Sequence, residues 1–246
     1  MGEVRVGVGG WTFEPWRGVF YPEKLPQKRE LAHMGERLTA CEVNGTFYSL
    51  QKPASYAKWR AETPDGFVFA LKGSRYIVNR KELAGAGEAM PKFFGSGMAE
   101  LGPKLGPMLW QFANTKKFDP DDFARFLDLL PQELDGLPLR HALEPRHDSF
   151  KDERFTTMVQ ERGHAVVYAE HGSYPRIEAH APDFAYARVQ QTREDVDAGY
   201  DDAELDRIAA MAKGWADQGR DVFLFVISGA KVRNPAAAEA IIARLG

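Results

Sequence analysis

The chain has 246 residues, 44% of them hydrophobic and 27% charged, which excludes a disordered protein and allows a full hydrophobic core. Its single cysteine, Cys41, excludes an internal disulfide and any metal site built on several cysteines. The formal net charge of -3 argues against a general affinity for nucleic acid or anionic membranes. The first residues show no leader pattern and no apolar run is long enough to cross a bilayer, so we expect a cytoplasmic protein with no membrane partner.

Eight short apolar segments predict β-strands along the chain. They cover residues 4–10, 39–44, 67–73, 106–112, 140–146, 165–170, 184–190 and 221–228. Strands that are apolar along most of their length are typical of a parallel sheet that is covered on both faces. The sequence therefore predicts a parallel sheet.

Helical patterns lie between most of these segments and carry clear start signals. The signals are Pro53, Pro91, Asp119 with Pro120, Asp152, Asp201 or Asp202, and Asn234 as an N-cap followed by Pro235. After the first and sixth strands the helical signal is weak, and we expect long loops over residues 11–23 and 171–183.

Strands that alternate with helices over this length predict an α/β protein with a single (β/α)8 TIM-type barrel, one domain spanning residues 1–246. The alternative is an open doubly wound sheet, whose nucleotide-binding turn shows the spacing G-x-G-x-x-G after the first strand. The turn here reads GVGGWTFEPWRG and lacks that spacing, which favours the barrel.

Six of the eight strands become charged or amide-bearing near their C-terminal ends, where barrels of this type carry their active sites. The residues concerned are Glu42, Asn44, Lys72, Gln111, Glu144, Arg146, Glu170, Arg188 and Gln190. Glu42 and Asn44 are two positions apart, so both are predicted to point into the mouth of the barrel while Cys41 faces the helices. The structural alternative is a set of internal ion pairs, such as Glu42 with Lys72 and Glu170 with Arg188.

Lysines and arginines also gather at or just after the same strand ends, which predicts a basic mouth and an anionic ligand. The segment ISGAKVRNPAAAEA after the last strand would hold an anion at the start of a helix, with Lys231 and Arg233 supplying charge. An ordinary strand, turn and capped helix with solvated loop charges is the alternative interpretation.

A metal site is a weaker hypothesis. His147 and His171 follow the fifth and sixth strands, and with Glu42, Glu144 and Glu170 they offer nitrogen and oxygen ligands for a divalent metal. No two histidines share a helix face at ligand spacing. No cofactor is therefore predicted, and a divalent metal stays an alternative.

Several segments resemble, in order and spacing, the YecE-like family, a domain of unknown function. They are GGWTFEPWRGVFYPEKLPQKREL, CEVNGTFYSLQKPASYAKWRAETPDGFVFALKGSRYI, KLGPMLWQF and LEPRHDSF, and the resemblance extends over the whole chain. It implies a TIM-type barrel and no particular reaction. The positions that it implies as recurrent site residues are Trp11, Trp16, Glu42, Asn44, Thr46, Tyr48, Lys72, Ser74, Arg75, Tyr76, Gln111, Glu144, Arg146, His147 and Arg188.

The chain departs from the family pattern on the last two strands. RVQQ stands at residues 188–191 where members commonly show R-L-H-G, and ISGAK stands where the eighth strand often ends in two asparagines and an acid. The part of the site contributed by these strands is therefore expected to differ from that of other members.

The leading functional hypothesis is an enzyme, a hydrolase, lyase or isomerase, that acts on a small anionic or sugar-like substrate. Glu42 and Glu144 would serve as acid and base, and Lys72 would tune a neighbouring carboxylate or form a Schiff base. The remaining candidate ligand-binding residues are Trp11, Trp16, Asn44, Thr46, Tyr48, Ser74, Arg75, Gln111, Arg146, His147, Arg188 and Lys231. The alternatives are a metal-dependent phosphodiester or nucleic-acid-processing enzyme and a non-catalytic anion-binding protein.

Overall fold

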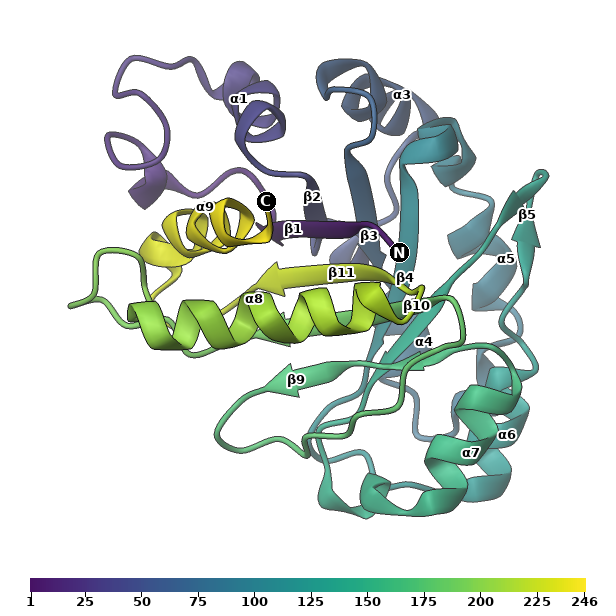
Figure 1. The fold of residues 1–246 in the computed structure, drawn as a ribbon. Coiled ribbons are helices and arrows are strands. Elements are labelled where there is room, and N and C mark those ends of the chain that lie inside the picture. Colours follow the sequence, from purple (N-terminus) through teal and green to yellow (C-terminus); the bar gives the residue numbers. More distant parts are fainter.

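Parallel strands close into a barrel surrounded by helices in the computed structural model, which describes residues 1–246 (Figure 1). The strands are β1 (Val4–Gly9), β2 (Ala40–Val43), β3 (Val68–Lys72), β4 (Leu105–Gln111), β7 (His141–Glu144), β8 (Ala165–Val166), β9 (Tyr168–Glu170), β10 (Phe184–Val189) and β11 (Asp221–Val226). Each predicted segment contains a strand and every pair of neighbours is parallel, so the predicted TIM-type barrel is confirmed.

The barrel closes at the sixth predicted strand, which is divided at Val167 into β8 and β9. The sheet runs in the order β8-β7-β4-β3-β2-β1-β11-β10-β9, so these two halves lie at its opposite ends. The N–H of Val167 donates to the carbonyl of Leu143 at 2.9 Å, and the N–H of Gln190 donates to the carbonyl of Glu170 at 3.1 Å. The interrupted strand β8–β9 therefore pairs with both ends of the sheet and closes the barrel.

Helices cover the outside of the barrel. They are α1 (Glu30–Arg37), α3 (Pro53–Glu62), α5 (Ala89–Phe94), α6 (Pro120–Leu127), α7 (Glu153–Glu161), α8 (Asp202–Asp217) and α9 (Asn234–Leu245), with the short helices α2 (Gly45–Tyr48) and α4 (Arg75–Val78) directly after β2 and β3. Short 3-10 turns lie at Glu14–Trp16, Gln27–Arg29, Leu83–Ala86, Met98–Lys104, Asp148–Lys151 and Lys231–Arg233. No helix follows β9, in agreement with the loop predicted over residues 171–183.

Acidic residues begin three of these helices as the sequence predicts. The side chains of Asp119 and Asp152 accept hydrogen bonds from the first backbone N–H groups of α6 and α7. Asp201 forms a capping box with Glu204 at the start of α8. Such caps satisfy N–H groups that a helix leaves without an internal partner, which fixes where each helix begins.

Four local features differ from the sequence expectations. Helix α1 follows the first loop although its signal is weak, and the helix expected from Pro91 ends at Phe94, with Gly95 as its C-cap. Asn234 is the first residue of α9 and not its cap. A hairpin of β5 (Glu133–Leu134) and β6 (Leu137–Pro138) was not predicted, although its Asp-Gly turn is a typical hairpin signal.

Two apolar clusters lie on the two sides of the barrel wall. The inner cluster fills the barrel and contains Ala40, Val68, Ala70, Leu109, Ala142, Ala165, Val167, Ala181, Phe184, Tyr186, Phe223, Phe225 and Ile227. The outer cluster of 54 residues lies between strands and helices, and it includes Cys41 as predicted. No helix combines the length and apolar character that crossing a membrane would require.

Candidate active site at the barrel mouth

The inward-facing positions of four strands end in charged side chains. Side chains alternate along a strand, so the inner cluster continues on β2, β3, β7 and β10 to Glu42, Lys72, Glu144 and Arg188. Glu42 and Glu144 are 0% exposed, Arg188 is 2% exposed and Lys72 is 8% exposed. In Figure 1 the arrowheads of β9 and β11 point to the left, so these two strands have their C-terminal ends at that side.

Arg188 binds both carboxylates from the centre of the barrel. Its guanidinium donates to both oxygens of Glu42, at 3.0 Å from Nε and 3.1 Å from Nη2, and its Nη1 donates to Oε2 of Glu144. The hydroxyl of Tyr186 donates to Oε2 of Glu42 at 2.8 Å. Since β1 and β11 separate β2 from β10 in the sheet, the contact between Arg188 and Glu42 crosses the interior.

Each carboxylate has a second set of donors at the mouth. Asn44 Nδ2 donates to Glu42 at 3.1 Å, while Gln111 Nε2 and Arg146 Nε donate to Oε1 of Glu144 at 3.2 and 2.7 Å. Burial alone would raise the pKa of Glu144, but attraction to Arg188 and Arg146 and their hydrogen bonds outweigh it and lower the pKa. Glu144 is therefore ionised at neutral pH.

Lys72 lies beside this cluster without an acidic partner. Its amine makes no hydrogen bond or ion pair with another residue and lies 4.6 Å from the centre of the Phe47 ring. Burial, and after it the neighbouring Arg188, lower the pKa of Lys72 to about 8, although Glu42 and Glu144 oppose the change. A substantial part of the amine is thus neutral in mildly alkaline solution.

The charges at the mouth do not balance. Lys72, Arg146 and Arg188 are three cations, and Glu42 and Glu144 are two anions, so three minus two leaves one positive charge when Lys72 is protonated. A protein interior disfavours such an excess unless an anion supplies the missing charge. The arrangement therefore suits a ligand with a single negative group.

Gln190 provides a further donor without a partner. The residue lies two positions beyond Arg188 on the inward side, is 4% exposed, and its Nε2 has no hydrogen-bond acceptor. A buried donor that lacks an acceptor costs about 1–3 kcal/mol. An oxygen atom of a ligand at the mouth would remove that cost. The sequence places Gln190 among the polar residues at the strand ends, but it was not among the candidate ligand-binding residues.

Glu170 does not join the site. It lies two positions after Tyr168, which belongs to the outer cluster, so Glu170 also faces the helices. There it accepts a hydrogen bond from Arg207 at 2.7 Å. The ion pairs named as alternatives, Glu42 with Lys72 and Glu170 with Arg188, do not form. Glu42 with Arg188 and Glu170 with Arg207 take their place.

The histidines considered as metal ligands have other roles. His147 Nδ1 accepts the N–H of Ser149 at 3.0 Å, and the ring of His171 stacks on Tyr174 with centres 3.8 Å apart. No group of three or more His, Cys, Asp or Glu side chains is placed so that it could hold a metal ion.

Thr46 and Ser74 support the local backbone. Thr46 Oγ1 donates to the carbonyl of Lys72 at 2.7 Å and lies 3.0 Å from the carbonyl of Val43, which ties α2 to the end of β3. Ser74 Oγ accepts the N–H of Tyr76 and caps α4. Both residues thus hold the loop that follows Lys72, and neither side chain belongs to the charged cluster.

The aromatic residues after β1 pack on the core. Trp16 is 0% exposed and its Nε1 donates to the carbonyl of Lys231 at 2.8 Å. Trp11 is half-buried and packs edge to face on Trp59 with ring centres 5.1 Å apart. The amine of Lys231 lies 4.1 Å from the centre of the Phe13 ring. Trp16 belongs to the outer apolar cluster, and Trp11 and Phe13 pack against it.

Tyr48 and Arg75 lie on the exposed rim. Tyr48 is 61% exposed, and the guanidinium of Arg75 lies 5.2 Å from the centre of the Tyr76 ring. Arg233 pairs with Asp197 at 3.4 Å, so of the two cations expected to hold an anion after β11 only Lys231 has no acidic partner.

A family model described as "Protein of unknown function DUF72" matches residues 5–246. The chain is similar to the UPF0759 protein YecE of Escherichia coli K12, with 29% identity over 142 residues, which are 56% of this chain and 48% of that protein. It is also similar to the UPF0759 protein YunF of Bacillus subtilis, with 24% identity over 44% of this chain and 39% of that protein. The aligned part thus spans about half, or less, of the length of these curated relatives.

Solved structures share the fold. A DUF72 family protein of Enterococcus faecalis V583 has a TM-score of 0.77 and 16% identity, with 98% of this chain and 95% of that chain covered. A DUF72 family protein of Thermotoga maritima MSB8 has a TM-score of 0.74 and 22% identity, with 98% and 97% covered. A xylose isomerase-like TIM barrel/4-hydroxyphenylpyruvate dioxygenase fusion protein has a TM-score of 0.53 and 12% identity, with 96% of this chain and 42% of that chain covered.

Proposed function

The chain belongs to the DUF72 family, whose description names no activity, and we propose that it is an enzyme that acts on a small anionic carbonyl compound at the barrel mouth, with Lys72 as its catalytic amine. The observation that carries this proposal is the state of Lys72. The amine is buried, lacks an acidic partner and has a pKa of about 8. A desolvated lysine beside other cations is an activated nucleophile for carbonyl substrates.

The proposed step is the formation of an imine. The neutral amine of Lys72 adds to the carbonyl carbon, and both hydrogens of the amine leave with the carbonyl oxygen as water. A proton from solvent then gives the charged imine, which draws electrons from an adjacent bond. Such chemistry serves lyases and isomerases, two of the three enzyme classes expected from the sequence.

The anionic group of the substrate would bind Arg146 and Gln190. Arg146 uses only Nε in its contact with Glu144, so its two terminal nitrogens are free to hold a carboxylate or phosphate. The unpartnered amide of Gln190 would donate to a substrate oxygen. These donors supply binding energy and fix the orientation of the carbonyl carbon toward Lys72.

The roles of Glu42 and Glu144 change in this proposal. The lowered pKa of Glu144 disfavours an acid role for it. Both carboxylates are held by Arg188, which occupies oxygens that a base would use. They act here as fixed negative charges that stabilise the positive charge of the protonated imine. Glu42 and Glu144 thus position Arg188 and stabilise the protonated imine, while Lys72 reacts with the carbonyl carbon.

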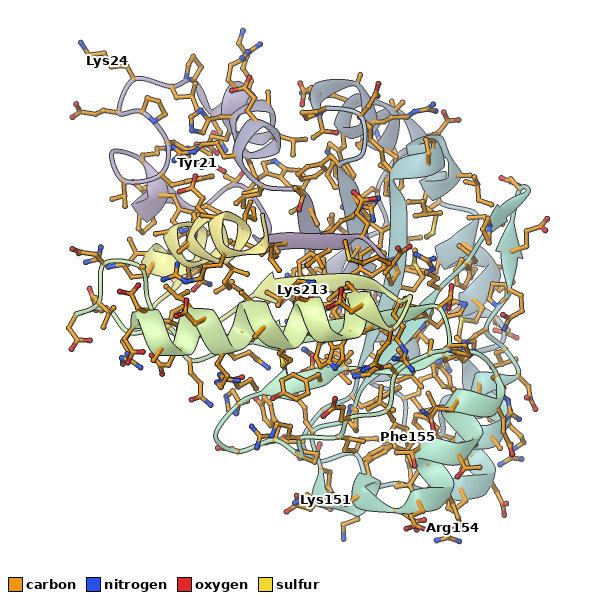
Figure 2. All side chains as sticks on the ribbon, in the orientation of Figure 1. Tyr21, Lys24, Lys151, Arg154, Phe155 and Lys213 are labelled. Atoms are coloured by element: carbon orange, nitrogen blue, oxygen red, sulfur yellow. The ribbon has the colours of Figure 1, made fainter.

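Borohydride trapping tests the proposal. We expect 2-oxobutanoate and dihydroxyacetone phosphate, as probes, to be reduced onto Lys72, with the adduct located by peptide mass spectrometry. Because the neutral amine reacts, the trapping rate should rise as the pH passes about 8 and then level off. Lys72→Met should abolish the adduct. Lys213→Met is the control, because Lys213 lies on α8, pairs with Asp217 and is 58% exposed (Figure 2).

Three results would contradict this function. They are the absence of any adduct with both probes, equal labelling of Lys72 and Lys213, and a trapping rate that does not change near pH 8. Binding of both probes without trapping would replace the enzyme by an anion-binding protein, the non-catalytic alternative.

A further inference from the structure

Large exposed hydrophobic side chains are scarce in this protein and are unevenly placed. They are Met1, Val19, Tyr48, Leu50 and Tyr76. Tyr48, Leu50 and Tyr76 are 61%, 50% and 63% exposed, and all three follow β2 or β3 on the mouth side of the barrel. Apolar side chains that gather in this way on a polar surface mark a binding site more often than single exposed ones do.

A cavity of about 280 Å³ lies beside these residues, between the segments that follow β2 and β3 and helix α5. Its apolar lining comes from Leu50, Tyr76, Ala89 and Phe93. Ligand pockets commonly begin at about 300 Å³ and combine an apolar wall with a few polar groups. We call it the α4–α5 cavity. Its size suits one ring or a short branched chain and not a whole cofactor.

The α4–α5 cavity is lined by the segment that directly follows Lys72. Ser74, which lines the cavity, follows Lys72 by two residues. Phe47 packs edge to face on Tyr48 with ring centres 4.9 Å apart, and the same ring lies 4.6 Å from the amine of Lys72. One aromatic residue therefore separates the exposed apolar patch from the charged mouth.

We propose that the α4–α5 cavity is a subsite for the apolar tail of the substrate, an aromatic ring or a branched alkyl group, whose anionic carbonyl end reaches Lys72. This inference rests on the proposed function for the anionic end, and it names the substrate class as amphipathic carbonyl acids. The serine hydroxyls in the lining, Ser49 and Ser74, leave room for one polar substituent on the tail. The tail would cover Leu50 and Tyr76, which are otherwise exposed to water.

Two matched probes test the subsite by isothermal titration calorimetry. They are 2-oxobutanoate and 2-oxo-4-phenylbutanoate, which share the anionic carbonyl end and differ by the phenyl group. Burial of the ring should make the second probe bind about tenfold more tightly, a value reduced from the full transfer free energy of a phenyl group because the tail loses freedom.

Two variants of the lining locate the effect. Ala89→Leu fills the cavity and Leu50→Ser removes part of its wall, so both should reduce the affinity ratio of the two probes toward one and leave the binding of 2-oxobutanoate unchanged. Val19→Ser is the matched control, because Val19 is 61% exposed and does not line this cavity. It should keep the ratio of the unmodified protein.

The outcomes separate the subsite from the proposed function. Equal affinity for the two probes, or a ratio that Ala89→Leu and Leu50→Ser leave unchanged, would overturn the subsite even if borohydride traps both probes on Lys72. A tighter phenyl probe whose advantage is lost in both variants, with no trapping of either probe, would retain the subsite and remove the amine chemistry. Circular dichroism of each variant checks that it is folded.

Discussion

At the scale of single residues, Arg188 organises the upper interior of the barrel. It holds two fully buried carboxylates that would otherwise lie in an apolar surrounding. Burial would lower the pKa of Arg188, but attraction to Glu144 and Glu42 more than offsets this and raises it, so the residue stays charged. The buried network is therefore a single unit whose members depend on one another.

Replacement of Arg188 by Met should destabilise the protein by about 3–5 kcal/mol at pH 7, because it leaves two buried carboxylates without their cation. In the unmodified protein the lowered pKa of Glu144 gives stability that is present above about pH 4.5 and is lost below it. The stability of the variant should depend on pH in the opposite direction, because its carboxylates become easier to protonate. The variant should therefore be more stable at pH 5 than at pH 7. Urea denaturation at both pH values measures the difference.

Arg154→Met is the control for this prediction. Arg154 pairs with Asp152 on the surface, and its side chain is 68% exposed. Figure 2 shows Arg154 near the start of α7. Exposed ion pairs contribute little, so no measurable loss is expected. Equal effects of the two substitutions would contradict a special role of Arg188.

The sequence located most of these residues but not their partners. Their positions at the C-terminal ends of predicted strands placed Glu42, Lys72, Glu144 and Arg188 at one end of the barrel, and the structure has them together. Glu170 was misplaced because AVVYAE is apolar up to its last residue, so no polar position sets which side faces inward. The contact between Arg188 and Glu42 joins strands that are not neighbours, and strand-by-strand reasoning has no means to predict it.

At the scale of elements, the end of β3 depends on its packing against β4. Gly73 follows Lys72, and a Cβ atom there would lie 2.3 Å from the ring of Trp110. Trp110 is 0% exposed and donates its Nε1 hydrogen to His141 Nδ1 at 3.0 Å. The buried ring has little space to move, so the glycine lets β3 and β4 approach each other beside Lys72.

Gly73→Ala should therefore destabilise the protein by about 1–3 kcal/mol through overpacking. Gly45→Ala is the matched control, since the atom nearest to its added Cβ is Gln51 Nε2 at 4.0 Å. Thermal unfolding followed by circular dichroism compares the two. A Gly73 variant as stable as the Gly45 variant would show that Trp110 can move after all.

Strands were easier to predict than helices in this chain. Apolar runs such as FVFALKG are typical of a strand that is buried on both sides. The pattern around α5 is interrupted by Gly95 and Gly97, and tertiary packing decided where that helix ends. The β5–β6 hairpin was missed although its Asp135-Gly136 turn, with both residues at positive φ, was visible in the sequence.

At the scale of the whole molecule, one closed sheet carries both the inner and the outer apolar cluster. The split strand β8–β9 connects the two ends of the sheet, so the sheet does not divide into two separate halves. The N-terminal segment is tied to the other end of the chain, as Gly2 donates to the carbonyl of Ala216 at 2.8 Å. We therefore expect residues 1–246 to behave as one domain.

Unfolding in urea should accordingly give one transition. The five tryptophans lie in both halves of the sequence, at positions 11, 16, 59, 110 and 215, so their fluorescence reports on the barrel as a whole. Fluorescence and far-ultraviolet circular dichroism should give the same midpoint. Two separated midpoints would contradict the single domain.

The missing acid partner of Lys72 has a practical consequence for laboratory work with this protein. A buried cation of this kind attracts small anions, and phosphate, citrate and sulfate are abundant in ordinary purification buffers. An anion that occupies the mouth favours the protonated amine and would slow the imine formation proposed for Lys72. A substrate screen in phosphate buffer would then report an inert protein, so extensive dialysis into a zwitterionic buffer of low ionic strength should precede any assay.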